Sequence, residues 1–543
     1  MKHKLLTGVT VAGLMLTAMP AFNVAAGAQQ SPGFRSEDAK GIKRVLLISI
    51  DGMHALDFAN CAKGTADGEP FCPNLARLAG HGVNYLAAST TTPSDSFPGT
   101  VGLITGGTPR TAGVYYDVSY DRQLSPPAQT TPYGLKGGAG LCPAQIGSVV
   151  AFDEEIDNDL TKLDGGGGIN PNYLPRDPNN NCAPVYPHTF LRDNTIFEVV
   201  RANGGYTAFS DKHPAYDFFN GPSGTGVNDL YSPEINSKVV PLPGVAGCEA
   251  VADPSADLTA WTNSFANIKC YDSIKVGVIL NEIDGKTHDG SASAPVPTLF
   301  GMNFQAVSVG EKLVENGVAG GYSDALGTPS ASLRGEIQFV DRSVGKIVAE
   351  LKRQGLYDST LLVITAKHGQ SPIDPKRVQR IPADNASGES PASLLGAQVA
   401  GSSEDDVSLL WLADQTQTSS AVATLNENEQ TIGGGEIYSG RSLQLMFDDP
   451  LVDSRTPDII VTPDVGVIYT GGKAKIAEHG GFAHDDVNVL MIVSNPGLPA
   501  KTVTQPVRTV QVAPTILKSL GLNPSSLRAV RIEGTQILPG LLF

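Results

Sequence analysis

The chain has few basic residues relative to acidic ones: 39 Lys and Arg stand against 55 Asp and Glu, for a formal net charge of −16. Neutralising a nucleic-acid backbone requires basic surface, so this composition argues against long polyanions as partners. We therefore expect no nucleic-acid polymer among its ligands. A small anion remains compatible, because a local cation in a binding site outweighs the field of distant surface charges.

Long apolar runs are missing after the first residues, so we expect no membrane anchor. The first four residues are basic in character, Leu5 to Ala21 form an apolar core, and Ala26-Gly27-Ala28 offers a small-residue cleavage site. This order is typical of a signal peptide covering residues 1–28. The sequence thus predicts an exported, periplasmic or extracellular protein whose mature chain is one domain, residues 29–543.

The six cysteines lack the close CxxC spacing of a zinc ribbon, which favours structural disulfides in an exported chain. Reduced thiols are the alternative. Six cysteines can pair in fifteen ways. Their order along the chain suggests Cys61 with Cys72, Cys142 with Cys182, and Cys248 with Cys270.

Three short apolar runs predict buried parallel strands, each followed by charged or metal-ligating side chains. The runs are Val45–Ile50 before Asp51, Val278–Leu280 before Asp284 and His288, and Leu361–Thr365 before Lys367 and His368. Ligands of open α/β sheets gather at the carboxyl ends of the strands. Carboxylate and imidazole groups suit zinc and similar divalent ions. The sequence therefore predicts an α/β fold with a metal site, interrupted by polar or Gly-rich insertions near 112–187 and 375–440.

Further short motifs complete a recognisable order. Ser96 lies in Pro93-Ser94-Asp95-Ser96-Phe97-Pro98-Gly99, His368 in Lys367-His368-Gly369, and His479 in His479-Gly480-Gly481. With Asp51 and the Asp284/His288 pair, these motifs resemble the alkaline-phosphatase superfamily and, within it, the type I phosphodiesterase/nucleotide pyrophosphatase family. The resemblance spans about four fifths of the chain. It implies a three-layer α/β/α sandwich with a mostly parallel central sheet.

The resemblance also implies roles for individual residues. Ser96 looks like the nucleophile, which also contacts metal; Asp51, Ser96 and His368 look like ligands of one ion, and Asp284, His288 and His479 like those of a second. The implied cofactor is a divalent metal, zinc above all, as one or two ions. Ser96 would attack phosphorus in a small phosphate ester or nucleotide, and water would hydrolyse the phosphoserine.

Two positions depart from the family pattern. Lys367 stands where the family has a metal-binding Asp, and one hypothesis is that its charge acts near the phosphoryl group beside a single or weakly held second ion. Asp117 stands where the family has an Asn that contacts substrate. An ionised Asp117 would repel the substrate, so it would be protonated, turned away or paired with metal, unless the loop is shifted by a residue.

Each candidate also has an ordinary structural explanation. A strand-ending Asp is frequently a turn or cap, and His484 competes with His479 for the ligand role. Phe97 could stack on a nucleobase, although core packing is the default for an aromatic residue. The loop Asp211-Lys212-His213 could line a pocket.

We expect a phosphodiesterase or nucleotide pyrophosphatase. The alternatives are a phosphomonoesterase or sulfatase on the same fold, although a Cys-x-Pro-x-Arg sulfatase signature is absent, or a catalytically inactive binding protein.

Overall fold

A computed structural model describes residues 41–65, 68–138, 142, 146–153, 156–237, 261–383, 389–470 and 475–543. The expected signal peptide, residues 1–28, lies outside the described residues. All described residues belong to one compact unit, Phe34–Phe543.

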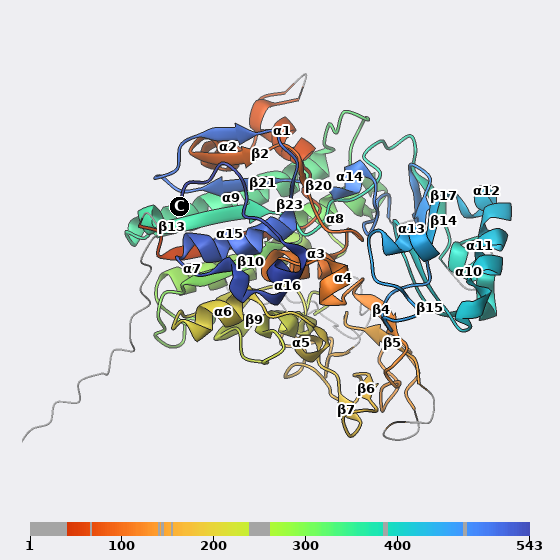
Figure 1. Ribbon diagram of the computed structural model, residues 1–543. Helices are drawn as coiled ribbons and strands as arrows, with labels where there is room; N and C mark the ends of the chain where they lie inside the picture. Colours follow the sequence, from red (N-terminus) through yellow and green to blue (C-terminus); the bar gives the residue numbers. More distant parts are fainter. Residues whose placement is uncertain are drawn as a thin grey trace, which may run out of the picture. The chain divides into compact units, whose positions relative to one another are not determined.

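The core of this unit is an eight-stranded sheet (Figure 1). In spatial order its strands are β22 (Lys501–Val503), β2 (Gly82–Tyr85), β21 (Met491–Ser494), β13 (Thr360–Thr365), β1 (Arg44–Ile50), β10 (Leu299–Phe304), β8 (Ala208–Ser210) and β9 (Asp229–Tyr231). Only β21 runs antiparallel to its neighbours. The first and third apolar runs of the sequence, Val45–Ile50 and Leu361–Thr365, thus form the adjacent central strands β1 and β13, with Val45 paired to Leu361.

Alternate residues of each central strand serve two different hydrophobic cores. Val45 and Leu47 pack on one face of β1, whereas Leu46 and Ile48 pack on the other. The first face is covered by α3 (Ser96–Thr105), α6 (Ile196–Ala202) and α15 (Val512–Ser519). The second is covered by α1 (Ala55–Lys63), α2 (Pro73–Gly80), α7 (Asn267–Ile283), α8 (Ala306–Lys312) and α9 (Ala331–Arg353). Burial on both faces explains the continuous apolar runs, and the predicted α/β/α sandwich is confirmed.

The predicted strand at Val278–Leu280 is wrong, because these residues lie inside the 17-residue helix α7. The buried positions Ile268, Tyr271, Ile279 and Ile283 recur at helical rather than alternating spacing. A short apolar run cannot be assigned to a strand from its own residues when a helix extends on its N-terminal side.

A second, antiparallel sheet is formed by β15 (Val399–Glu404), β16 (Ser408–Leu412), β18 (Ile459–Pro463) and β17 (Gly434–Ser439). One face packs on α10 (Pro391–Leu395) and α11 (Thr418–Glu427), and the other contacts Tyr115 and Tyr116. One strand of this sheet, β18, lies beyond residue 440, where the sequence places the end of the insertion.

Short elements complete the described fold. In the region 112–187, β4 (Val118–Asp121) pairs with β5 (Ser148–Ala151), and β6 (Arg176–Asp177) with β7 (Ala183–Pro184). Elsewhere lie β3 (Ala88–Ser89), β11 (Val314–Glu315), β12 (Val318–Ala319), β14 (Gln379–Ile381), β19 (Val467–Tyr469), β20 (Asn488–Val489) and β23 (Val507–Arg508). The remaining α-helices are α4 (Pro109–Ala112), α5 (Pro187–Phe190), α12 (Glu429–Ile432), α13 (Gly440–Gln444), α14 (His484–Val487) and α16 (Arg528–Glu533).

Two of the three expected disulfides are present, Cys61–Cys72 and Cys142–Cys182. Cys270 is also disulfide-bonded, but its expected partner, Cys248, lies outside the described residues.

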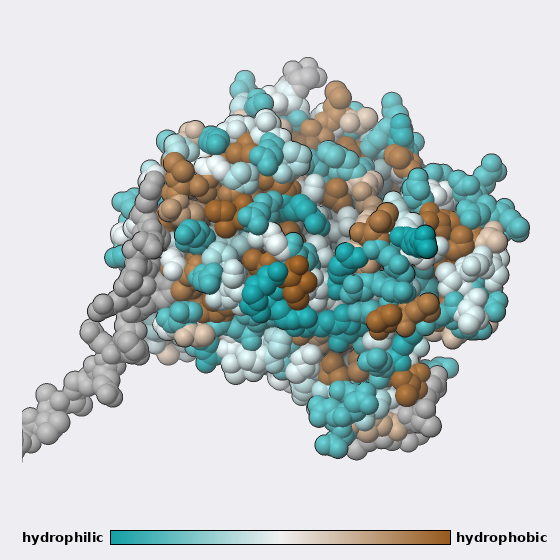
Figure 2. Space-filling model, viewed as in Figure 1, coloured by the Kyte–Doolittle hydropathy of each residue, from teal (hydrophilic) through white to brown (hydrophobic). Residues whose placement is uncertain are grey.

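The viewed surface mixes hydrophilic and hydrophobic residues (Figure 2). Within the described ranges, every helix is too short or too polar to cross a bilayer.

Candidate active site at the carboxyl edge of the central sheet

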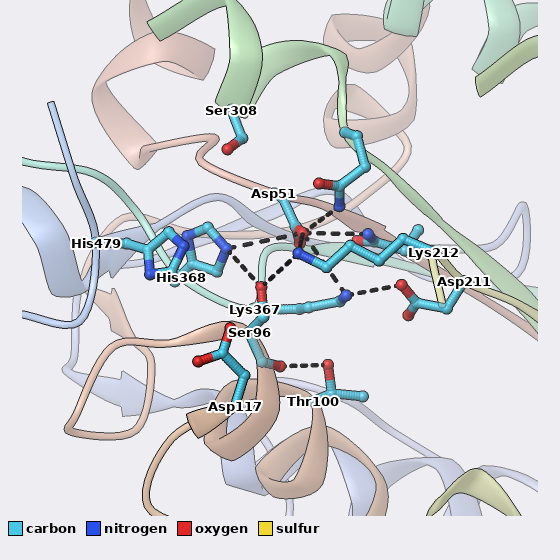
Figure 3. Close-up of polar contacts among 12 residues, drawn as sticks. Asp51, Ser96, Thr100, Asp117, Asp211, Lys212, Ser308, Lys367, His368 and His479 are labelled. Atoms are coloured by element: carbon cyan, nitrogen blue, oxygen red, sulfur yellow. Dashed lines mark hydrogen bonds and ion pairs between the residues drawn. The ribbon is translucent and has the colours of Figure 1, made fainter. Parts of the chain in front are cut away.

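Ser96 is the first residue of α3 and lies at the centre of a buried polar group (Figure 3). Asp95 caps the helix, with its carboxylate accepting a hydrogen bond from the Phe97 amide. The Ser96 hydroxyl Oγ lies 3.0 Å from Lys212 Nζ and 3.2 Å from His368 Nε2. A helix N-terminus favours negative charge, so this position suits an oxygen that becomes anionic or bonds to phosphorus.

His368 follows β13 and is held in one tautomer. Its Nδ1 lies 2.8 Å from the Gly369 carbonyl oxygen, which can only accept, so Nδ1 carries the proton. Burial lowers the pKa of His368 below its usual value. The neutral ring therefore presents the Nε2 lone pair to the Ser96 hydroxyl, as a general base would.

Asp51 follows β1 and is fully buried. Its Oδ2 accepts hydrogen bonds from the side-chain amides of Asn303 and Gln305. Burial alone would raise the pKa of Asp51, but the nearby Lys367, His368 and Lys212 together hold it well below the usual value.

Two lysine ammonium groups face Asp51. Lys367 Nζ lies 3.6 Å and Lys212 Nζ 3.9 Å from Asp51 Oδ2. Lys367 Nζ also donates to Asp211 Oδ1 and to the Tyr216 hydroxyl, each at 2.9 Å. Burial lowers the pKa of Lys367, whereas for Lys212 the surrounding carboxylates outweigh burial and raise the pKa.

The spacing between α3 and β13 depends on a glycine. Gly99, one turn after Ser96, lies against the backbone of Lys367, and a Cβ at this position would overlap the Lys367 carbonyl oxygen. The absence of a side chain lets the two elements approach closely enough for Ser96 to reach His368.

His479 lies beside His368, with ring centroids 4.2 Å apart, and its Nδ1 lies 3.6 Å from Asp95 Oδ2. Burial, followed by the charges of His368 and nearby lysines, holds the pKa of His479 well below its usual value. His484, the competing candidate, is exposed at the start of α14. The residues around Ser96, namely Asp51, Lys212, Lys367 and His368, form the Ser96 group. The structure brings His479 to this group and leaves His484 outside it.

Asp117 lies near Ser96 (Figure 3), and its backbone N–H donates to Asp95 Oδ1 at 3.2 Å. Burial, and next the charge of Asp117, raise the pKa of Asp95 well above its usual value. Phe97 differs from expectation: its ring is 2% exposed and packs on Tyr216 and Phe218 in the core. The expectation that it stacks on substrate is corrected, because its neighbours already cover the ring.

Asp284 and His288 lie at the opposite edge of the sheet. Asp284 follows α7 and accepts a hydrogen bond from Arg353 at 2.8 Å. His288 Nδ1 lies 2.6 Å from Asp229, the first residue of β9. The twelve residues of helix between Asp272, which caps the α8 amides near the carboxyl edge, and Asp284 span about 18 Å. The structure therefore does not place this pair with His479, correcting the expected ligand set.

Sequence reasoning missed several members of the site. Asp211 and Lys212 follow β8, and Asn303 and Gln305 lie at the end of β10. The sequence predicts that the loop at Asp211 lines a pocket. It does not predict the strand before that loop, because β8 is only three residues long. Asn303 and Gln305 carry amide side chains rather than the carboxylate or imidazole groups that suit zinc, so the sequence does not mark them as metal ligands.

We tested whether these residues fit the metal centre that the resemblance implies. Among the described residues, only His54, Asp57 and Glu311 place three potential ligand atoms within 4.8 Å of one another, so this buried group could bind a metal ion. Asp51, His368 and His479 do not form such a group, although Asp51 Oδ1 and His479 Nδ1 lack hydrogen-bond partners within the described chain. Because Asp284 and His288 lie at the far edge of the sheet, the Ser96 group lacks two of the six expected ligands and does not fit the two-ion arrangement.

Comparison with known proteins supports the fold and the motif order. The profile described as "Type I phosphodiesterase / nucleotide pyrophosphatase" matches residues 45–133 and 320–484, which include Asp51, Ser96, His368 and His479. No curated protein sequence gives a match.

Solved structures show the same fold. Murine ectonucleotide pyrophosphatase / phosphodiesterase 5 superposes with a TM-score of 0.52 at 13% identity, covering 89% of this chain and 96% of the murine chain. An inactive variant of the murine protein in complex with AMP gives the same values. The human protein gives a TM-score of 0.50 at 13% identity, covering 88% of this chain and 95% of its own. The chain thus matches the type I phosphodiesterase/nucleotide pyrophosphatase family over nearly half of its residues and shares the fold of these solved structures.

Proposed function

We propose that the protein hydrolyses phosphodiester or nucleotide pyrophosphate bonds through a phosphoserine intermediate at Ser96. The observation that carries the proposal is the position of the Ser96 hydroxyl between the basic Nε2 of His368 and the ammonium group of Lys212. A nucleophile within hydrogen-bonding reach of an oriented base is the arrangement that covalent catalysis requires.

In the first step the Ser96 oxygen forms a bond to phosphorus while its proton passes to His368 Nε2. The bond from phosphorus to the leaving oxygen breaks on the side opposite Ser96, and that oxygen takes up a proton from solvent. Lys212 stabilises the negative charge that develops on Ser96, and Lys367 adds positive charge beside Asp51. Water then attacks the phosphoserine and gives up a proton to solvent, and the Ser96 oxygen leaves with the proton held by His368, which restores its hydroxyl and releases a phosphate monoester.

The substrate class follows from charge. Asp117 lies beside Ser96 and would repel a dianionic monoester more strongly than a monoanionic diester, so we assign a small phosphodiester or a nucleotide. The AMP complex of the murine protein is consistent with a nucleotide ligand. The net charge of −16 disfavours long polyanionic substrates.

For the expected divalent metal, zinc above all, we propose one ion at the buried His54 group and none at Ser96. We also propose that the protein is exported, since its disulfides suit an oxidising compartment.

The test compares wild type, Ser96→Ala and Ser94→Ala on chromogenic aryl phosphate diesters and monoesters. Ser94 is a matched control, because it is equally buried two residues away and bonds to the Asp486 carbonyl. We expect diester turnover in wild type and Ser94→Ala, and at least a thousandfold loss in Ser96→Ala. Equal turnover in Ser96→Ala would refute the nucleophile. Turnover of monoester alone would indicate a phosphomonoesterase, and AMP binding without turnover a binding protein.

A further inference from the structure

We propose that the Ser96 group is a metal-free site in which the ammonium groups of Lys212 and Lys367 replace two divalent ions. This inference rests on the proposed function and identifies the source of the positive charge that phosphoryl transfer requires. Several of the residues that carry it, Lys212, Asn303 and Gln305 among them, lie outside the ranges that the family profile matches.

The surroundings of Asp51 carry the argument. Among the closest polar neighbours of its Oδ2 atom, the amides of Asn303 and Gln305 and the two ammonium groups are N–H donors, while the unprotonated Nε2 of His368 lies 3.7 Å away. An N–H group donates hydrogen bonds and cannot ligate a cation. A divalent ion bound to this oxygen at about 2 Å would meet two positive charges that lie within 4 Å of the same atom.

Both lysines are fixed in place. The Lys367 side chain is 1% exposed and is anchored by Asp211 and Tyr216, so its ammonium group cannot swing out to make room for an ion. Lys212 comes from the end of β8 and reaches Ser96 itself. One ammonium group thus contacts the reacting oxygen, while the second faces the buried carboxylate.

The replacement involves three strand ends together. Lys367 follows β13, Lys212 follows β8, and the amides lie at the end of β10. A single lysine in a metal site would leave the other ligands able to bind. Here the lysines and amides surround Asp51 Oδ2 from three strand ends, so an ion bound to that oxygen would have to displace fixed N–H donors.

The first experiment measures metal content per chain by elemental analysis after purification with added Zn²⁺. The variants His368→Ala and Glu311→Gln distinguish the Ser96 group from the His54 group. We expect that His368→Ala leaves the zinc content unchanged, and that chelation alters the kcat/KM of wild type for a diester by less than twofold. An ion lost in His368→Ala but retained in Glu311→Gln would overturn the proposal, as would a hundredfold chelation loss restored by zinc.

The second experiment opens the site with the double variant Lys212→Ala/Lys367→Asp, with folding checked by circular dichroism. We expect this variant to bind one more Co²⁺ than wild type, seen as new visible absorption. A folded double variant that gains no Co²⁺ would show that the lysines are not what excludes the ion. Metal content is measured without turnover. An inactive wild type would therefore refute the proposed function, but the Co²⁺ content of the double variant would still test whether the lysines exclude an ion.

Discussion

Removal of the Lys212 charge tests the proposed catalytic site most directly. The ammonium group lies 3.0 Å from Ser96 Oγ. At an effective dielectric constant of 20, a full negative charge on that oxygen would interact with it by about 5.5 kcal/mol. The transition state carries part of that charge, so we expect Lys212→Met to lose about 3 kcal/mol of stabilisation, or a factor of about 10² to 10³ in kcat.

The assay is steady-state hydrolysis of a chromogenic phosphodiester. We expect the loss to appear mainly in kcat, because the charge on Ser96 develops during reaction. Lys212→Arg keeps the charge and should retain more activity, and Lys346→Met, an exposed lysine on α9, serves as the control for altered net charge. A folded Lys212→Met enzyme with kcat within tenfold of wild type would show that the contact is structural.

Three further predictions concern stability and the corrected residues. Burial raises the pKa of Glu336 to about 7 despite its ion pair with Lys269, so the folded state retains this proton and stability falls as pH rises from about 4.5 to 7. Glu336→Gln should flatten that decline, by up to about 3 kcal/mol in urea unfolding; an unchanged pH slope would contradict the assignment. Asp284→Ala and His288→Ala should each keep kcat/KM within about twofold, because both lie at the far edge of the sheet, and a tenfold loss would restore them to the site. Cys61→Ser should lower the free energy of unfolding by about 2 to 3 kcal/mol, and equal urea midpoints would count against that value.

The sequence predicts the central strands well. Strands buried on both faces of the sheet have continuous apolar runs, and charged or imidazole side chains follow these runs. Asp51 and His368 were found for this reason. Helix α9 shows the same agreement, since its apolar residues recur along one face from Ile337 to Leu351. Local pattern and tertiary position agree in these elements.

The errors arise where local pattern and tertiary position diverge. The Asp284/His288 spacing matched a ligand motif, but the helix α7 carries it to the wrong edge of the sheet. The loop that holds Lys212 is expected to line a pocket, but the role of Lys212 depends on contacts with Ser96 and Asp51 from distant parts of the chain. Such contacts have no trace in the spacing of residues along one segment.

The close packing of Gly99 on the Lys367 backbone gives one position unusual leverage over reactivity. Gly99 has no side-chain functional group. Its lack of a Cβ permits the close approach of α3, which carries Ser96, and the segment after β13, which carries His368. A methyl group at position 99 would therefore push α3 away from the Lys367 backbone and separate Ser96 from His368, although both side chains would be unchanged. A side chain added at Gly99 would thus change the distance between Ser96 and His368 without altering either functional group.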